Sequence, residues 1–190
     1  HEIEVWNESG TSYVWVRVPQ INASSDSDSI VMYYGNAGVV GDGQNSPALW
    51  GDFTAVYHMN EDPGAGGTVV NSIGVNDAIN YGSTDTVGII GNAQSFDGSN
   101  DYLDLGDDRP WLNNATGATL SLWMNPDNLS GNHDMLGFTV NQGGTSSLSR
   151  FTLIQNGDEI RLIGRTMDDL SDTVTVQTNT SPLTAGQWHH

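Results

Sequence analysis

The sequence has no cysteine, no lysine and no long apolar run, and each absence narrows the range of folds and partners. Without cysteine the chain cannot be a small disulfide scaffold. No apolar run reaches the length of about 18 residues that a membrane-spanning helix needs, so direct membrane insertion is not expected. No helical periodicity persists over about a dozen residues, so helices are expected to contribute little.

Positive charge is also scarce, since five arginines face 23 acidic residues for a formal net charge of −18. Proteins bind phosphate backbones and anionic lipids through Lys and Arg, so nucleic acid and bare membrane are poor candidate partners. The acidic surplus has two explanations, a solvated surface or divalent cation binding. Among the acids Asp outnumbers Glu, and Asn is abundant, which favours turns and loops over helices.

What the sequence does contain is repeated alternation of polar and apolar residues in short runs between turn residues, the pattern of half-buried strands. It predicts an all-β, antiparallel fold. The expected strands are 2–6, 13–18, 29–34, 54–59, 93–96, 102–105, 119–124, 135–140, 150–155, 159–164 and 173–177. The clearest element is a hairpin around Asn156-Gly157-Asp158, because Asn-Gly tolerates the positive φ angles of a tight turn.

The domain organisation is indicated by a Gly- and Asn-rich stretch from Gly35 to Pro47 that breaks the alternation. We expect residues 1–40 to be the C-terminal part of a small β module, 41–52 to be a linker, and 53–190 to be a larger module. Trp50 and Phe53 are expected to be buried at the junction. The chain opens in mid-strand without a signal peptide, which predicts that it is part of a longer chain.

Four blocks of the larger module carry a family resemblance. They are similar, in order, to the opening strand, a strand-turn-strand, a Trp-containing strand and a Trp-His-His strand start of LamG-like jelly rolls in the concanavalin A-like lectin/glucanase superfamily. The blocks are Ala55 to Glu61, Gly91 to Leu103, Thr119 to Pro126 and Gln187 to His190. The resemblance implies an antiparallel jelly-roll β-sandwich over 53–190, truncated at its C-terminal end.

The segment before the jelly roll is similar to the C-terminal half of a bacterial domain of unknown function that often precedes LamG-like modules in exported proteins. The similar parts are Glu2 to Trp6, Val14 to Pro19 and Ile30 to Asn36. Together the resemblances imply an extracellular or cell-surface adhesion or carbohydrate-binding module of a larger protein, with glycans or other surface proteins as partners. A purely structural stalk or fibre segment is the alternative, and a glycoside hydrolase is a third hypothesis.

The hydrolase hypothesis depends on a pair of carboxylates, which retaining glycosidases hold about 5 to 5.5 Å apart. Glu2 and Glu4 share one face of a strand because they are two residues apart. However, Asn7 stands where the motif of laminarinase-type relatives requires a carboxylate. No catalytic residue is therefore expected, and the chain is not expected to be an enzyme. His58 lies on an alternating strand, where packing or an internal hydrogen bond is expected.

Oxygen-bearing side chains gather in the turn between Phe96 and Tyr102. Calcium takes about six to eight oxygen ligands, so this turn is the candidate site of a structural Ca²⁺, the only cofactor expected. The candidate ligands are Asp97, Asn100 and Asp101. An Asx-turn, in which these side chains bond only to their own backbone, explains the same residues equally well.

Lectin sites use exposed aromatic, amide and acidic side chains on loops, and four residues are of that kind. The candidate ligand-binding residues are Tyr81, Trp111, Asn113 and Asn114. Each is equally explained by packing at the rim of the sandwich. The alternation also predicts a set of core residues, with Ser121 facing the opposite way; they are Phe96, Tyr102, Leu120, Leu122 and Trp123.

Overall fold

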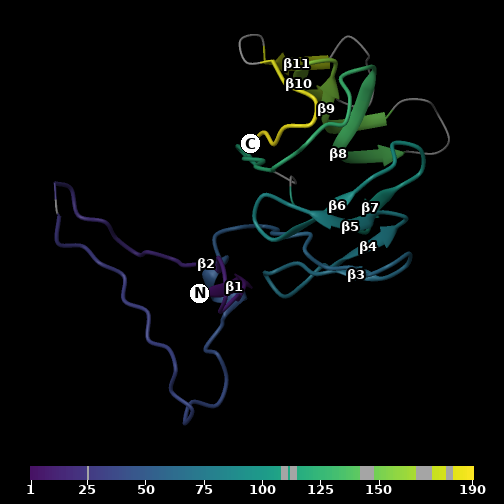
Figure 1. The fold of residues 1–190 in the computed structure, drawn as a ribbon. Coiled ribbons are helices and arrows are strands. Elements are labelled where there is room, and N and C mark those ends of the chain that lie inside the picture. Colours follow the sequence, from purple (N-terminus) through teal and green to yellow (C-terminus); the bar gives the residue numbers. More distant parts are fainter. Residues whose placement is uncertain (25, 108–110, 112–114, 142–147, 166–172, 179–181) are drawn as a thin grey trace. The chain divides into compact units, whose positions relative to one another are not determined.

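The computed structural model describes residues 1–24, 26–107, 111, 115–141, 148–165, 173–178 and 182–190 (Figure 1). The described residues form antiparallel sheets and almost no helix, so the expected all-β class is confirmed. By compactness the chain divides into two units, residues 1–118 and residues 119–190. None of the helical segments in the described ranges has the length and apolar character that crossing a membrane requires.

The described residues of the first unit form seven short strands in three small antiparallel sheets. β1 (Glu2–Val5) pairs with β2 (Tyr13–Trp15), and β5 (Thr84–Val87) pairs with β6 (Asn92–Ser95). The third sheet has the order β3 (Thr68–Val69), β4 (Ala78–Tyr81) and β7 (Tyr102–Asp104).

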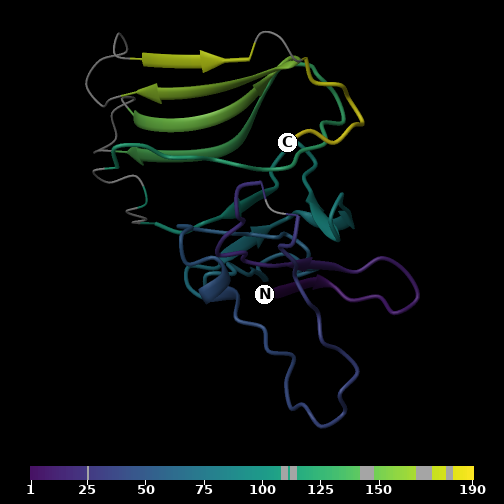
Figure 2. The same cartoon turned by 90° about the vertical axis from the view of Figure 1, so that its left-hand side faces the viewer.

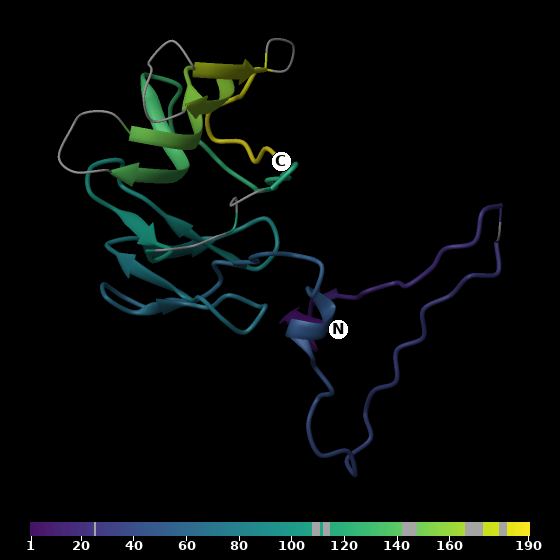
Figure 3. The ribbon, with the colours of Figure 1, turned by 180° about the vertical axis from the view of Figure 1, so that it is seen from behind.

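Helix α1 (Ser46–Leu49) lies beside the β1–β2 pair (Figure 3). The side chain of Asn45 caps its start by accepting the Ala48 N–H, which satisfies one of the amides that a helix leaves without a backbone partner. The guanidinium of Arg17, two residues after β2, donates to the carbonyl of Ala48. The helix thus brings the residues that follow it next to the start of the chain.

The core of the first unit is partly polar. The alternation along β4 buries Ala78 and Asn80 and exposes Ile79 and Tyr81. The amide of Asn80 donates to the carbonyls of Gly64 and Ser83, and its carbonyl oxygen accepts the Ser83 N–H. A buried amide needs such hydrogen-bond partners. Here the Asn80 side chain links the loop at Gly64 to the turn at Ser83.

In the second unit the described residues form a four-stranded sheet of order β11 (Thr173–Gln177), β10 (Glu159–Arg165), β9 (Leu148–Asn156) and β8 (Asn132–Asn141) (Figure 2). The predicted hairpin is confirmed, because β9 and β10 pair from Asn156 and Glu159 onward. The turn between them is Gly157-Asp158, with Gly157 at a φ of 62°. Thr152 and Ile154 of β9 are buried.

Three predicted strands do not form. Residues 29–34 have no strand partner and their large side chains are exposed, so the alternating pattern there has no surface to pack against. Residues 54–59 and 119–124 make only the isolated bridges Tyr57–Asn71 and Met124–His189. Conversely, β3, β4 and β5 were not expected, because they are short and lie among Gly, Asn and Ser residues.

The core prediction is wrong for three aromatics. Phe96, Tyr102 and Trp123 are exposed. Leu120 and Leu122 are only half-buried, and Ser121 between them is exposed, in agreement with its predicted opposite facing. Tyr102 is exposed because its register partner is Tyr81, on the outer face of β4.

The predicted junction residues differ from each other. Trp50 is half-buried, but Phe53 is 55% exposed because it lies in the turn after α1. Helix α1 lies within the predicted linker of residues 41–52. The module boundary itself stays a prediction.

Candidate functional site

Strand β1 places two acidic side chains on one face. Glu2 and Glu4 are two residues apart, and both carboxylates reach the same residue, His58. The register of the β1–β2 pair shifts between Ile3 and Val5, so Glu4 has no direct partner in β2. Trp15 of β2 lies directly across from Glu2. Its indole nitrogen reaches diagonally along the face and donates to Glu4 Oε2 at 2.7 Å.

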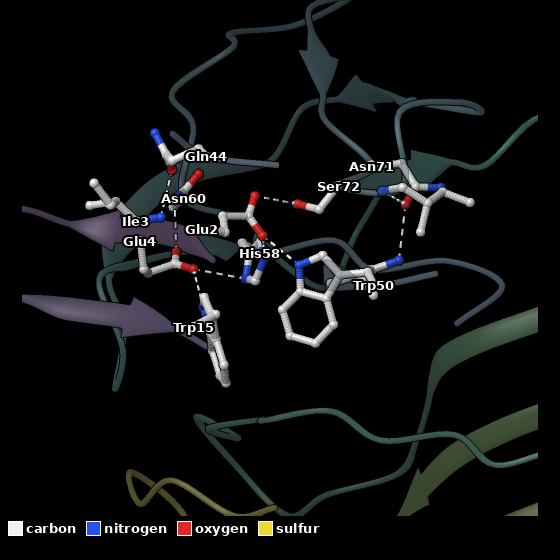
Figure 4. A network of polar contacts seen from close by, with 12 residues as sticks. Glu2, Ile3, Glu4, Trp15, Gln44, Trp50, His58, Asn60, Asn71 and Ser72 are labelled. Atoms are coloured by element: carbon white, nitrogen blue, oxygen red, sulfur yellow. Dashed lines mark hydrogen bonds and ion pairs between the residues drawn. The ribbon is translucent and has the colours of Figure 1, made fainter. Parts of the chain in front are cut away.

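His58 lies between these two carboxylates (Figure 4). Its Nε2 is 3.1 Å from Glu2 Oε2, and its Nδ1 is 2.8 Å from Glu4 Oε2. The side chains of His58, Glu2 and Glu4 are 13%, 15% and 1% exposed. Ionised carboxylates only accept hydrogen bonds, so both ring nitrogens can donate only when His58 is an imidazolium cation.

Neutral donors complete the hydrogen bonding of the carboxylates. Trp50 Nε1 donates to Glu2 Oε2 at 2.5 Å, and the Ser72 hydroxyl donates to Glu2 Oε1 at 2.9 Å. Trp15 and Asn60 donate to Glu4, the latter at 2.8 Å. We call the group of Glu2, Glu4, Trp15, Trp50, His58, Asn60 and Ser72 the Glu-His-Trp network.

The network shifts the pKa of each of its three ionisable groups in the direction that favours the charged form. Burial by itself would raise the pKa of Glu4, but hydrogen bonds from His58 and Trp15 and the charge of His58 outweigh it, so this pKa is lowered. The pKa of Glu2 is lowered in the same way, with burial opposed chiefly by the hydrogen bonds from Trp50 and Ser72. Burial would lower the pKa of His58, yet the two carboxylates raise it.

These protonation states restrict the chemistry of the network. A general acid must carry a proton near neutral pH, and neither Glu2 nor Glu4 does so with a lowered pKa. Every carboxylate oxygen already accepts at least one hydrogen bond. What the network does is orient aromatic rings, because it fixes the indole nitrogens of Trp15 and Trp50. The two indole rings meet edge to face at 5.5 Å, and Phe53 continues the cluster at 5.2 Å from Trp50.

Of the predicted ligand-binding residues, Tyr81 stacks on an aromatic residue that was expected to lie in the core. Its ring is stacked on that of Tyr102, with centroids 4.7 Å apart and an angle of 8° between the planes. The two side chains are 44% and 51% exposed. Trp111 is half-buried. Asn113 and Asn114 lie outside the described residues.

The predicted calcium ligands form a tight turn. Asp97 Oδ1 accepts the N–H groups of Ser99 and Asn100, and Asp101 Oδ2 accepts the Asp97 N–H. These bonds are those of the Asx-turn alternative. Among the residues that the structure describes, no three His, Asp or Glu side chains converge as metal ligands. The calcium site therefore stays a prediction.

The sequence analysis paired Glu2 with Glu4 but considered His58 separately and did not bring the three together. A pair of acids on one strand face and a histidine on an alternating segment were visible signals. Neither shows that the two segments meet, because the contacts join residues 56 positions apart.

Comparison with known families matches two separate parts of the chain. Residues 1–62 match a domain of unknown function, DUF2341, and residues 97–190 match Laminin_G_3, the concanavalin A-like lectin/glucanases superfamily. No curated protein and no solved structure gives a match. All members of the network except Ser72 fall within the first match. The chain thus carries a DUF2341 domain followed by a Laminin_G_3 domain, which implies a concanavalin A-like β-sandwich.

Proposed function

We propose that the chain is an extracellular, non-catalytic carbohydrate-binding module of a larger surface protein. The observation that supports this proposal is the exposed pair Tyr81 and Tyr102 on neighbouring strands. Superfamily membership alone does not assign a function, because unrelated activities share one fold.

The stacked tyrosines form an amphipathic surface. Cross-strand pairing places Tyr81 beside Tyr102 and Ile79 beside Asp104, and all four side chains are exposed. The rings offer apolar faces to the C–H groups of a sugar, while the phenol hydroxyls and the Asp104 carboxylate offer hydrogen bonds to its hydroxyls. We call Ile79, Tyr81, Tyr102 and Asp104 the tyrosine face.

The absence of catalysis is part of the proposal. Glycoside hydrolysis needs one protonated carboxyl group and one ionised carboxylate beside the substrate. The pKa values of Glu2 and Glu4 are both lowered, which favours the ionised form of each. Their carboxylates already accept hydrogen bonds from side chains of the protein itself. This supports binding rather than hydrolysis.

The test is a titration with a panel of neutral oligosaccharides, measured by calorimetry. We expect one or more to bind, and a Tyr81→Ala, Tyr102→Ala double variant to bind them at least about tenfold more weakly, about 1.4 kcal/mol. Tyr33→Ala is the matched control, because Tyr33 is an exposed tyrosine outside the strands. Binding that survives the double variant would contradict the assigned face. No binding to any glycan would favour the structural stalk, and release of reducing sugar would favour the hydrolase.

A further inference from the structure

A shallow hollow of about 260 Å³ opens beside the Glu-His-Trp network. Trp15, Trp50 and Phe53 line it, together with the buried side chain of Leu49. Arg17 and Asp52 also line it, and both are largely exposed. All of these residues fall within the region that matches the domain of unknown function, and none belongs to the tyrosine face.

The aromatic lining is held in place by buried charges. Glu4 fixes the indole of Trp15, Glu2 fixes that of Trp50, and His58 connects the two carboxylates. Two indoles that only filled a core would not need an ionic support, which costs desolvation free energy when it is buried. A ligand site benefits from it, because rings fixed in advance lose little freedom when the ligand binds.

The polar part of the lining carries no net charge. Arg17 Nη2 and Asp52 Oδ2 form an ion pair at 2.8 Å. A guanidinium has five N–H donors and a carboxylate accepts several hydrogen bonds, so this pair still offers donors and acceptors side by side. That combination suits vicinal hydroxyl groups, which both donate and accept, and it gives no preference to an ionic ligand.

We propose that this hollow binds one neutral pyranose ring, with the ring's C–H groups against Trp15, Trp50 and Phe53 and its hydroxyls hydrogen-bonded to Arg17 and Asp52. The volume limits the occupant, since pockets for drug-sized ligands begin at about 300 Å³. The net charge of −18 disfavours sulfated or uronic sugars. A ligand of this size is expected to bind with a dissociation constant on the order of millimolar.

The test follows the indole N–H resonances of the ¹⁵N-labelled chain during titration with methyl glycosides of glucose, galactose and mannose. The resonances of Trp15 and Trp50 are assigned with Trp→Phe variants. We expect at least one glycoside to shift both resonances saturably while those of Trp123 and Trp188 stay unchanged. Failure of all three glycosides to shift them up to about a hundred millimolar, well above the expected dissociation constant, would overturn the proposal.

Two variants of exposed residues locate the site without disturbing the fold. Phe53→Ala removes one aromatic wall, and Asp52→Asn removes the negative charge of the ion pair and replaces one of its two acceptor oxygens with an NH₂ donor. Each is expected to weaken the glycoside-induced shift at least about fivefold, whereas Tyr33→Ala leaves it unchanged. An unchanged affinity in both variants would overturn the assignment to the hollow.

The result of this titration can be distinguished from the result of the test for sugar binding at the tyrosine face. The Tyr81→Ala, Tyr102→Ala double variant is expected to retain the shifts of Trp15 and Trp50, because its residues lie outside the hollow. Loss of these shifts in the double variant would assign the sugar to the tyrosine face and overturn the inference. If tetramethylammonium produces the shifts and the glycosides do not, the hollow is a cation site. If the resonances shift with protein concentration in the absence of sugar, the occupant of the hollow is a second copy of the chain. Either result would also overturn the proposal that the hollow binds a pyranose ring.

Discussion

The β1–β2 region and the four-stranded sheet of the second unit are stabilised in different ways. β1 and β2 have four and three residues, so their ladder is short, and buried side-chain contacts from His58, Asn60 and Ser72 supplement it. β8 and β9 have ten and nine residues and are joined by a long ladder whose register shifts once, between Asp134 and Leu136. The short strand pair is thus supplemented by an ionic network, whereas the long strands are joined by many more backbone pairs.

The largest expected effect is the loss of one partner from the network. Glu4→Ala leaves the His58 cation, Trp15 and Asn60 without their shared acceptor, and breaking a buried pair in this way costs about 3–5 kcal/mol. Urea unfolding followed by tryptophan fluorescence measures this cost. Glu8→Ala, at an exposed glutamate of the same region, is the matched control and is expected to change stability by less than about 0.5 kcal/mol. Equal effects of the two variants would contradict the network.

The same network predicts how stability depends on pH. The pKa of His58 is raised above 6.5, so its contribution is complete below pH 6.5 and is lost as pH rises through the folded-state value. The pKa values of Glu2 and Glu4 are lowered below 4.5, so their contributions are complete above pH 4.5 and are lost as pH falls through the folded-state values. Maximal stability from the network is therefore expected between pH 4.5 and 6.5.

Thermal melts at intervals of about half a pH unit, from pH 3 to 9, measure this profile. His58→Gln is expected to be less stable and to lose the alkaline decline, because a glutamine does not titrate. His133→Gln in β8 is the matched control and is expected to keep the decline. A decline of the same size in the His58→Gln variant would assign it to another group.

A smaller effect is expected in the regular sheet. Ile154→Val removes one buried methylene group from β9, which costs about 0.5–1.5 kcal/mol. Val174→Ala on the exposed β11 is the control and is expected to cost less. Denaturant midpoints of the two variants measure the difference. A larger loss from the exposed site would show that the buried face of the sheet has been misassigned.

The smallest effect is expected at the ion pair of Arg17 and Asp52. Both side chains are exposed, so Asp52→Asn is expected to cost less than about 1 kcal/mol, unlike Glu4→Ala in the same region. Denaturant unfolding at low and high salt measures it, because salt screens an exposed pair. A cost that approaches that of Glu4→Ala would mean that the pair is part of the buried network.

Much of the second unit could be predicted from the sequence. The hairpin of β9 and β10 follows from alternation around Asn-Gly, and β11 was predicted with its observed bounds, because long alternating runs are a local signal. The first unit was harder, since β3, β4 and β5 have two to four residues each. At residues 29–34 the error was the opposite, since a strand was predicted there and none forms. Alternation alone does not supply a partner strand.

The sequence by itself determined the all-β class, the two family regions, the hairpin turn and the shared strand face of Glu2 and Glu4, because each depends on residues close together in the chain. Only the tertiary structure decided that His58 lies between those two carboxylates, that Trp15 and Trp50 line one hollow, and that Tyr102 is exposed beside Tyr81. These facts depend on contacts between distant segments. Alternation assigns a side chain to a face but does not say what covers that face.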